Sequence, residues 1–349
     1  MRIHVVRLFG SVYLRRGLGL AVSALTLYLA LRNVTLSEIW AALTQADAGF
    51  VGLALLNVAV NTLAKAFRWR VFLGRAGARI SVFRVLQVLL VGQMLNTLYP
   101  ARIGDLSRVY MLGSQGLGRA FCLGTLLLEK LVDLLSYTLL FLLLVFLVPL
   151  PAWIDDSVYT FSLVILVASA AVIFLAYRPQ AFLCALGRLA GGVPTTVQAY
   201  INSRFRSVMD SLEVLHSRRV LFSLVAWSAL IWGTAILNNH LVLLAIGIDL
   251  PWTASLLVLM VLMAGISIPS VPGKIGIFEY SCILALAVYG IGQAPALSYG
   301  IVLHSIVLLP TTLLGLLYFW LHGLGAGHGR LVNHIRENRL ATSEGRAEP

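Results

Sequence analysis

Two short stretches of this sequence place charged side chains beside helix-breaking residues. The first, YPARIGDLSR, covers residues 99–108 and carries Arg102, Asp105 and Arg108. The second, VPGKIGIFE, covers residues 271–279. Guanidinium and ammonium groups hold phosphate oxygens through charge-assisted hydrogen bonds, while carboxylates can balance those cations or bind a cationic group or protons. We therefore predict that these stretches recognise a charged chemical group.

The two stretches are copies of one motif. Pro100-Ala-Arg-Ile-Gly aligns without gaps to Pro272-Gly-Lys-Ile-Gly, and an acidic residue follows each copy. Proline and glycine interrupt helices, so each copy predicts a helix break. The residues expected at these breaks are Pro100, Gly104, Pro269, Pro272, Gly273 and Gly276. In the alternative interpretation both copies are ordinary interfacial loops, whose Arg and Lys side chains extend to lipid headgroups.

Three further charges lie near the start of the apolar segment 120–148. Glu129 and Asp133 are four residues apart and share a helix face, with Lys130 beside them. An ionisable group at the bilayer centre costs roughly 3 kcal/mol or more, so we expect these acids to face a cavity or the bundle interior, paired with motif cations. Alternatively, Glu129 and Lys130 lie at the membrane interface.

The polar and charged residues of the two motif copies and of segment 120–148 are together the predicted substrate-binding residues. They are Asn96, Arg102, Asp105, Arg108, Glu129, Asp133, Lys274 and Glu279.

Other polar residues inside apolar segments have a structural interpretation. Asn57, Asn61 and Lys65 follow one another at intervals of four residues, and Asn238 and Asn239 interrupt another segment. Asparagines between membrane helices commonly join them by hydrogen bonds worth about 1 kcal/mol. We expect that role for the asparagines.

The composition predicts an integral membrane protein. Of 349 residues, 59% are hydrophobic and only 11% are charged, whereas soluble domains carry about 25% charge. The net charge of +12 resides in loops between apolar segments, which indicates the positive-inside rule rather than nucleic-acid binding. The sequence has no nucleotide-binding or metal-ligand motif, so we expect no cofactor and no metal.

Charge in the loops sets the expected topology. A span needs roughly 20 apolar residues, and the clearest segments are about 17–31, 49–67, 120–148, 158–176, 220–246 and 296–321. Arginine-rich loops alternate with acidic ones, which places both termini in the cytoplasm. For this alternation to hold, each motif region must cross the membrane an even number of times. The simplest solution is a re-entrant hairpin in each half.

We therefore expect an all-α polytopic membrane protein with about six full transmembrane helices and two re-entrant helical hairpins, arranged as an inverted-topology repeat. The first repeat covers residues 1–150, with its hairpin entering from the cytoplasm. The second covers residues 151–322, with its hairpin entering from outside. A polar cytoplasmic tail, 323–349, is expected to be disordered. Broken helices at matching places in two inverted halves are typical of a transporter's binding site.

The stretches LNTLYPARIGDLSRVYML, TLLLEKLVDLL and SIPSVPGKIGIFE together resemble the lysylphosphatidylglycerol synthase transmembrane-domain family, also called flippase-like domain proteins. The resemblance covers nearly the whole chain. The positions that match the family pattern are Asn96, Pro100, Arg102, Gly104, Arg108, Glu129, Asp133, Pro269, Pro272, Gly273, Gly276 and Glu279. Phe67-Arg68-Trp69 is similar to the family's Arg-Trp at the end of its second span. Two positions depart from the pattern: Asp105 replaces a glutamate, and Lys274 replaces a glycine.

The resemblance implies a standalone translocator in the inner membrane, without the soluble synthase domain or its aminoacyl-transfer activity. Its substrate would be an envelope lipid of phospholipid, polyprenyl-phosphate or hopanoid type, moved between leaflets through a polar groove between the two hairpins. The alternative is an integral membrane transferase acting on a lipid-linked substrate, and a non-catalytic scaffold is the weakest interpretation because it needs no buried charge. A homodimer is compatible with the sequence.

Overall fold

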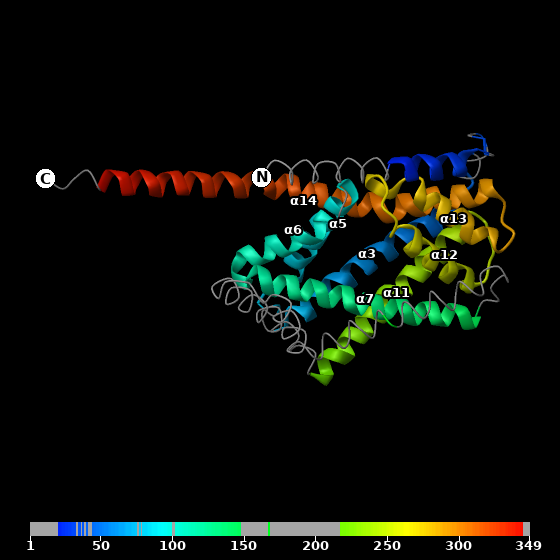
Figure 1. Cartoon of the computed structure of the whole chain (residues 1–349), viewed down its shortest axis with the longest axis horizontal. Coiled ribbons are helices and arrows are strands. Elements are labelled where there is room, and N and C mark those ends of the chain that lie inside the picture. Colours follow the sequence, from blue (N-terminus) through cyan, green and yellow to red (C-terminus); the bar gives the residue numbers. More distant parts are fainter. Residues whose placement is uncertain are drawn as a thin grey trace, which may run out of the picture.

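The computed structural model describes residues 20–32, 34, 35, 37, 40, 44–74, 77, 79–99, 102–147, 167 and 217–344. The regular elements in these ranges are helices (Figure 1). They are a short helix Leu20–Leu31, α3 (Ala48–Phe72), α5 (Val82–Leu98), α6 (Ile103–Leu112), a π-helical turn η1 (Gly113–Leu117), α7 (Arg119–Leu147), α11 (Arg218–Ala245), α12 (Trp252–Gly265), a 3-10 turn η3 (Pro272–Lys274), α13 (Ile277–Ala287) and α14 (Gln293–Glu344).

Four of the helices are long and apolar enough to cross a membrane, by length and composition: α3, α7, α11 and the part of α14 from Gln293 to Leu321. They correspond to four of the predicted spans. The predicted span 17–31 contains the shorter apolar helix Leu20–Leu31. The predicted span 158–176 lies outside the described residues except for position 167, so the structure supports a multi-pass α-helical membrane protein without fixing the number of crossings.

Each motif copy lies at the break of a helical hairpin. In the first hairpin α5 ends at Leu98, and Tyr99 is extended, with φ −121° and ψ 143°, as expected for a residue that precedes proline. In the second hairpin α12 is followed by the turn η3 and then α13. The longest of these helices, α5, has 17 residues, which is fewer than the roughly 20 needed to span a bilayer.

Small residues let the two helices of each hairpin approach closely. A Cβ atom on Gly104 of α6 would lie 1.8 Å from the carbonyl oxygen of Gly92 in α5. In the second hairpin, a Cβ atom on Gly265 would lie 2.1 Å from Ser281 Oγ. Because each of these glycines lacks a side chain, the two helices of its hairpin can lie close together, a packing that is frequent between membrane helices.

The long helices surround the hairpins, which lie toward different ends of the helical body in Figure 1. The central helices α3 and α11 pack against each other and contribute to two apolar clusters, one around each hairpin. Each hairpin also contacts a long helix that is distant in the sequence: Tyr137 of α7 donates to the carbonyl of Met260 in α12 at 3.2 Å, and α14 packs on α5 beside Gly315. These contacts connect the first and second hairpins through the long helices.

The last helix extends beyond its apolar part. It continues to Glu344, and the disorder expected over residues 323–349 stays a prediction. Figure 1 shows its final part, in red, projecting away from the other helices. Helical backbone satisfies its own hydrogen bonds, so the polar composition of this segment does not prevent it from continuing the apolar helix that precedes it.

Candidate functional site

The cations of the two motif copies share an unusual backbone conformation. Arg102 has φ 53° and Lys274 has φ 58°, and they are the only non-glycine residues with positive φ in the described part of the chain. Left-handed backbone costs an L-residue roughly 1–2 kcal/mol. The sequence alignment of Arg102 with Lys274 thus has a counterpart in the fold, because α6 begins one residue after Arg102 and α13 begins three residues after Lys274.

The tip of the first hairpin is held by a side-chain clamp. Asn96 Nδ2 donates to Asp105 Oδ1 at 3.1 Å, and its Oδ1 accepts from the Asp105 backbone N–H at 3.3 Å. Asp105 also pairs with Lys130 Nζ at 3.2 Å. The Asp105 side chain therefore connects three helices: its own helix α6, α5 through Asn96, and α7 through Lys130.

Buried ion pairs extend from this junction along α7. Arg108, which is 3% exposed, pairs with Glu129 at 3.2 Å and approaches Asp105 at 3.5 Å. Its guanidinium lies 4.8 Å from the ring centre of Trp69, within the range of a cation–π contact. The partner of Asp133 is Arg68, at 2.6 Å. Both acids therefore face the protein interior with cationic partners, as predicted, although the partner of Asp133 is not one of the motif cations.

Glu279 holds the tip of the second hairpin. Its Oε2 accepts from the backbone N–H of Gly276 at 2.7 Å, and its Oε1 is 2.7 Å from His304 Nδ1 on α14. The imidazole of His304 also stacks on Phe278, with ring centres 4.2 Å apart. One carboxylate thus joins the start of α13 to the long helix α14.

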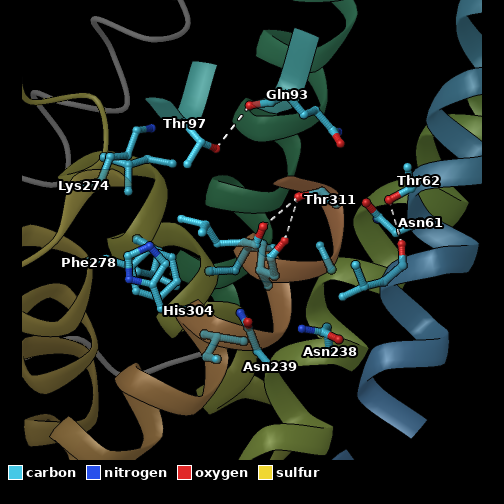
Figure 2. Close-up of a pocket in the computed structure, with 18 of the residues that line it drawn as sticks. Asn61, Thr62, Gln93, Thr97, Asn238, Asn239, Lys274, Phe278, His304 and Thr311 are labelled. Carbon is cyan, nitrogen blue, oxygen red and sulfur yellow. Dashed lines mark hydrogen bonds between the residues drawn. The ribbon is translucent and has the colours of Figure 1, made fainter. Parts of the chain in front are cut away.

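A cavity of about 350 Å³ lies between the hairpins (Figure 2). The first hairpin contributes Gln93, Asn96 and Thr97, near the end of α5, to its wall. The second hairpin contributes Gly273 and Lys274 of the turn η3. The long helices contribute the polar residues Asn57, Asn61, Lys65, Asn238, Asn239 and His304. Other parts of the wall are apolar and include Leu259, Leu262, Met263, Phe278, Val307 and Leu308. Figure 2 shows Lys274 and Asn61 on opposite sides of this space.

Two of the eight predicted binding residues, Asn96 and Lys274, line this cavity. Arg102 is exposed and does not line it. The other five belong to the contacts described above: Asp105, Arg108, Glu129 and Asp133 to the ion pairs, and Glu279 to the contact with His304. Among the residues predicted at the helix breaks, Gly104, Pro269, Pro272, Gly273 and Gly276 lie at or beside the breaks, and Pro100 lies outside the described residues.

Several residues of the cavity were not predicted as binding residues. Asn57 and Asn61 do form the expected bonds between helices, since Asn57 Nδ2 donates to the Thr234 carbonyl and Asn61 Nδ2 to the Ile231 carbonyl, each at 2.7 Å. Lys65 follows them on the same helix face, and this spacing is the sequence signal that would have pointed to it. His304 had no such signal, because its partner Glu279 is 25 residues away.

The apolar helices and the two hairpins define a multi-pass α-helical membrane protein, with an open and largely apolar cavity between its helices that carries polar side chains on its wall. The chain belongs to the family described as the lysylphosphatidylglycerol synthase TM region, whose model matches residues 17–315. It is 24% identical over 299 residues to the UPF0104 membrane protein PH1989 of Pyrococcus horikoshii, an alignment that covers 78% of this chain and 86% of that protein.

Proposed function

We propose that this protein moves a lipid with a polar phospho-headgroup between the two leaflets of the membrane, with the headgroup passing through the cavity between the hairpins. The observation that carries the proposal is the cavity itself: about 350 Å³ of space with amide, hydroxyl and amino groups on a largely apolar wall, open on one part and bordered by helices suited to a membrane.

The cavity combines the two surfaces that such a substrate needs. A lipid headgroup must remain solvated by polar groups while it crosses the bilayer, whereas the tails stay in an apolar environment. Asn57, Asn61 and Lys65 line the cavity from α3, and Leu259 and Met263 line it from α12. Headgroup and upper tail atoms could therefore be accommodated together.

We further propose that the two halves form an inverted repeat whose hairpins enter from opposite faces of the membrane. The shared backbone conformation of Arg102 and Lys274 and the reciprocal packing of α7 on α12 and α14 on α5 support this arrangement. The loop charges support a cytoplasmic-membrane location with both termini inside. In an inverted repeat, alternating access arises when one half rocks against the other around a fixed site.

The alternative function, a lipid-linked transferase, receives less support from the site. A general base must reach the reacting group within hydrogen-bond distance. No aspartate or glutamate is among the described residues that line the cavity, and the motif acids are engaged with cations or, for Glu279, with His304. Among the described wall residues, His304 and the two lysines are the candidate acid–base groups, whereas the amide side chains, which serve binding rather than proton transfer, are more numerous.

Leaflet-resolved lipid analysis tests this function. In cells with and without the protein, the total amount of each lipid is compared with the fraction that an impermeant reagent reaches from outside. We expect unchanged totals and a changed outer-leaflet fraction for the transported lipid. A lipid that is missing from the total pool, or accumulates in it, would instead indicate the transferase, and an unchanged lipid distribution would contradict both.

A further inference from the structure

The charged groups beside the cavity do not balance. Four cations and three carboxylates lie at the junction of α3, α6 and α7: Lys65, Arg68, Arg108 and Lys130 against Asp105, Glu129 and Asp133. Arg68, Arg108 and Lys130 each have a carboxylate partner. Lys65 is therefore the surplus cation of this cluster.

Lys65 is held near the cluster but is not paired within it. Among the described residues, no carboxylate oxygen lies within 4.0 Å of its amino group. Its nearest electrostatic neighbours include Asp133, which is bonded to Arg68, and Glu129, which is bonded to Arg108. The Lys65 side chain is only partly exposed and lines the cavity. A cation in such a place is costly unless an anion accompanies it.

Lys274 is a second cation of the cavity without a carboxylate partner in the described part of the chain. The nearby acid of its own hairpin, Glu279, is engaged with His304 and Gly276. Its left-handed φ of 58° is a conformation that glycine adopts without strain, and glycine is the usual residue here in the family pattern. A lysine at this position accepts backbone strain and places its charge in the cavity.

Two buried amide groups add free hydrogen-bonding atoms to the same wall. Asn238, which is 4% exposed, has an Nδ2 donor without a partner among the described residues, and Gln93 has an Oε1 acceptor without one. Figure 2 shows both side chains in the wall of the cavity. Buried polar atoms are seldom left without partners, so these two indicate a polar occupant.

We propose that the occupant is an anionic lipid headgroup, such as a phosphate diester without an amine, and that Lys65 and Lys274 supply its counter-charges. The Asn238 amide would donate to a headgroup oxygen, and Gln93 Oε1 would accept from a headgroup hydroxyl. A cationic, aminoacylated headgroup is disfavoured because the described wall offers it no unpaired carboxylate. The inference that the bound anion belongs to a lipid rests on the proposed function.

Binding to the purified full chain in phosphatidylcholine nanodiscs tests this selectivity. Fluorescent phosphatidylglycerol represents the anionic headgroup, and fluorescent lysyl-phosphatidylglycerol represents the cationic one. We expect the wild-type protein to bind phosphatidylglycerol at least about tenfold more tightly, because loss of a desolvated charge partner weakens binding by more than about tenfold. Equal affinities for the two lipids, or no binding of phosphatidylglycerol, would overturn the proposal.

Three variants assign the effect to the lysines. Lys65→Gln and Lys274→Gly should each weaken phosphatidylglycerol binding by about tenfold or more. Arg218→Gln is the control, because it removes the same charge from an exposed side chain at the start of α11 that does not line the cavity; it should bind as wild type does. Glycine fits the backbone at position 274, so Lys274→Gly should keep the wild-type melting temperature, which separates lost binding from lost folding. Wild-type binding by both cavity variants would overturn the proposal.

Translocation in liposomes, measured on the same preparations, separates this proposal from the proposed function. If the protein binds phosphatidylglycerol selectively but translocates no lipid, the proposed lipid transport is wrong, whereas the proposed anion-binding site is supported. If the protein binds both lipids equally and translocates them at equal rates, the proposed anion-binding site is wrong, whereas the proposed lipid transport is supported.

Discussion

Most charged motif residues of this protein contact one another rather than the cavity. Arg108 lies between Glu129 and Asp105 and against Trp69, and Arg68 holds Asp133. Buried pairs of this kind contribute little net stability compared with apolar residues of equal size, but the loss of one partner leaves an uncompensated charge. We therefore infer that these pairs fix the position of the first hairpin against α7, while the unpaired lysines face the cavity.

Glu129→Gln should destabilise the protein more than it weakens lipid binding. The substitution leaves the Arg108 guanidinium, only 3% exposed, with Asp105 at 3.5 Å as its remaining charged partner. We expect a loss of about 3 kcal/mol in the free energy of unfolding, seen as a lower melting temperature in detergent.

The double variant Arg108→Leu, Glu129→Leu is the control, because removal of both charges avoids the unpaired guanidinium. It should be more stable than the single variant. A double variant less stable than Glu129→Gln would contradict the interpretation of this pair.

The sequence identifies which residues are charged but not which ones meet. Glu129 and Asp133 are correctly expected inside the protein with cationic partners, because their helix spacing and the cost of bare membrane charge are both readable from sequence. The pairing of Asp133 with Arg68, which is 65 residues away, depends on how α3 packs against α7. The importance of Lys65 is hidden for the same reason: its lack of a partner is visible only after every nearby acid has been assigned.

At the scale of elements, the hairpins depend on glycine contacts. The 1.8 Å separation between a Cβ atom on Gly104 and the Gly92 carbonyl oxygen cannot be relieved by a side-chain rotation, because the obstructing atom belongs to the backbone. The alignment of the two motif copies predicts the breaks, and Gly104 is one of the residues predicted there. It does not predict that this glycine also permits α5 and α6 to touch.

Gly104→Ala should therefore separate α5 from α6. We expect a loss of about 3 kcal/mol in the free energy of unfolding, at the upper end of the usual range for overpacking, measured as a fall in melting temperature. Gly52→Ala in α3 is the matched control, since a Cβ atom there would meet nothing within 4 Å. Equal melting temperatures for the two variants would show that the hairpin tolerates the extra methyl group.

The second hairpin should become mobile when its carboxylate is removed. Glu279→Ala eliminates both the bond to the Gly276 N–H and the contact with His304. We expect faster hydrogen exchange over residues 272–282 because local opening exposes these amides. Ser267→Ala, which removes an exposed hydroxyl bonded within its own helix region, should leave the exchange unchanged. Unaltered exchange in Glu279→Ala would show that apolar packing alone holds this tip.

At the scale of the whole molecule, helix ends that the loop charges assign to the same side of the membrane lie together. Asp47, at the start of α3, donates its backbone N–H to the Ala245 carbonyl at the end of α11 at 2.8 Å. Gln293, at the start of α14, donates to the carbonyls of Leu29 and Ala30 at 2.8 and 3.0 Å. All of these ends are expected outside. The distribution of charge in the loops thus predicts which helix ends lie on the same side of the membrane. It contains no information on the cavity between the helices.

The opposite entry of the two hairpins is the decisive feature of an inverted repeat, and single cysteines can test it. Ser81, at the start of α5, and Asp249, before α12, are both exposed. In a background without the natural Cys122, Cys184 and Cys282, Ser81→Cys should react with an impermeant maleimide only after the membrane is opened. Asp249→Cys should react in intact cells.

Two reference positions calibrate this labelling. Ser217→Cys, before α11, should behave like Ser81→Cys, and Asp47→Cys, before α3, should behave like Asp249→Cys, because loop charges place them inside and outside respectively. If Ser81→Cys and Asp249→Cys react from the same side while the reference positions differ, both hairpins enter from one face. The cavity would then be reached from that face alone, and rocking of two inverted halves could not move a headgroup from one leaflet to the other.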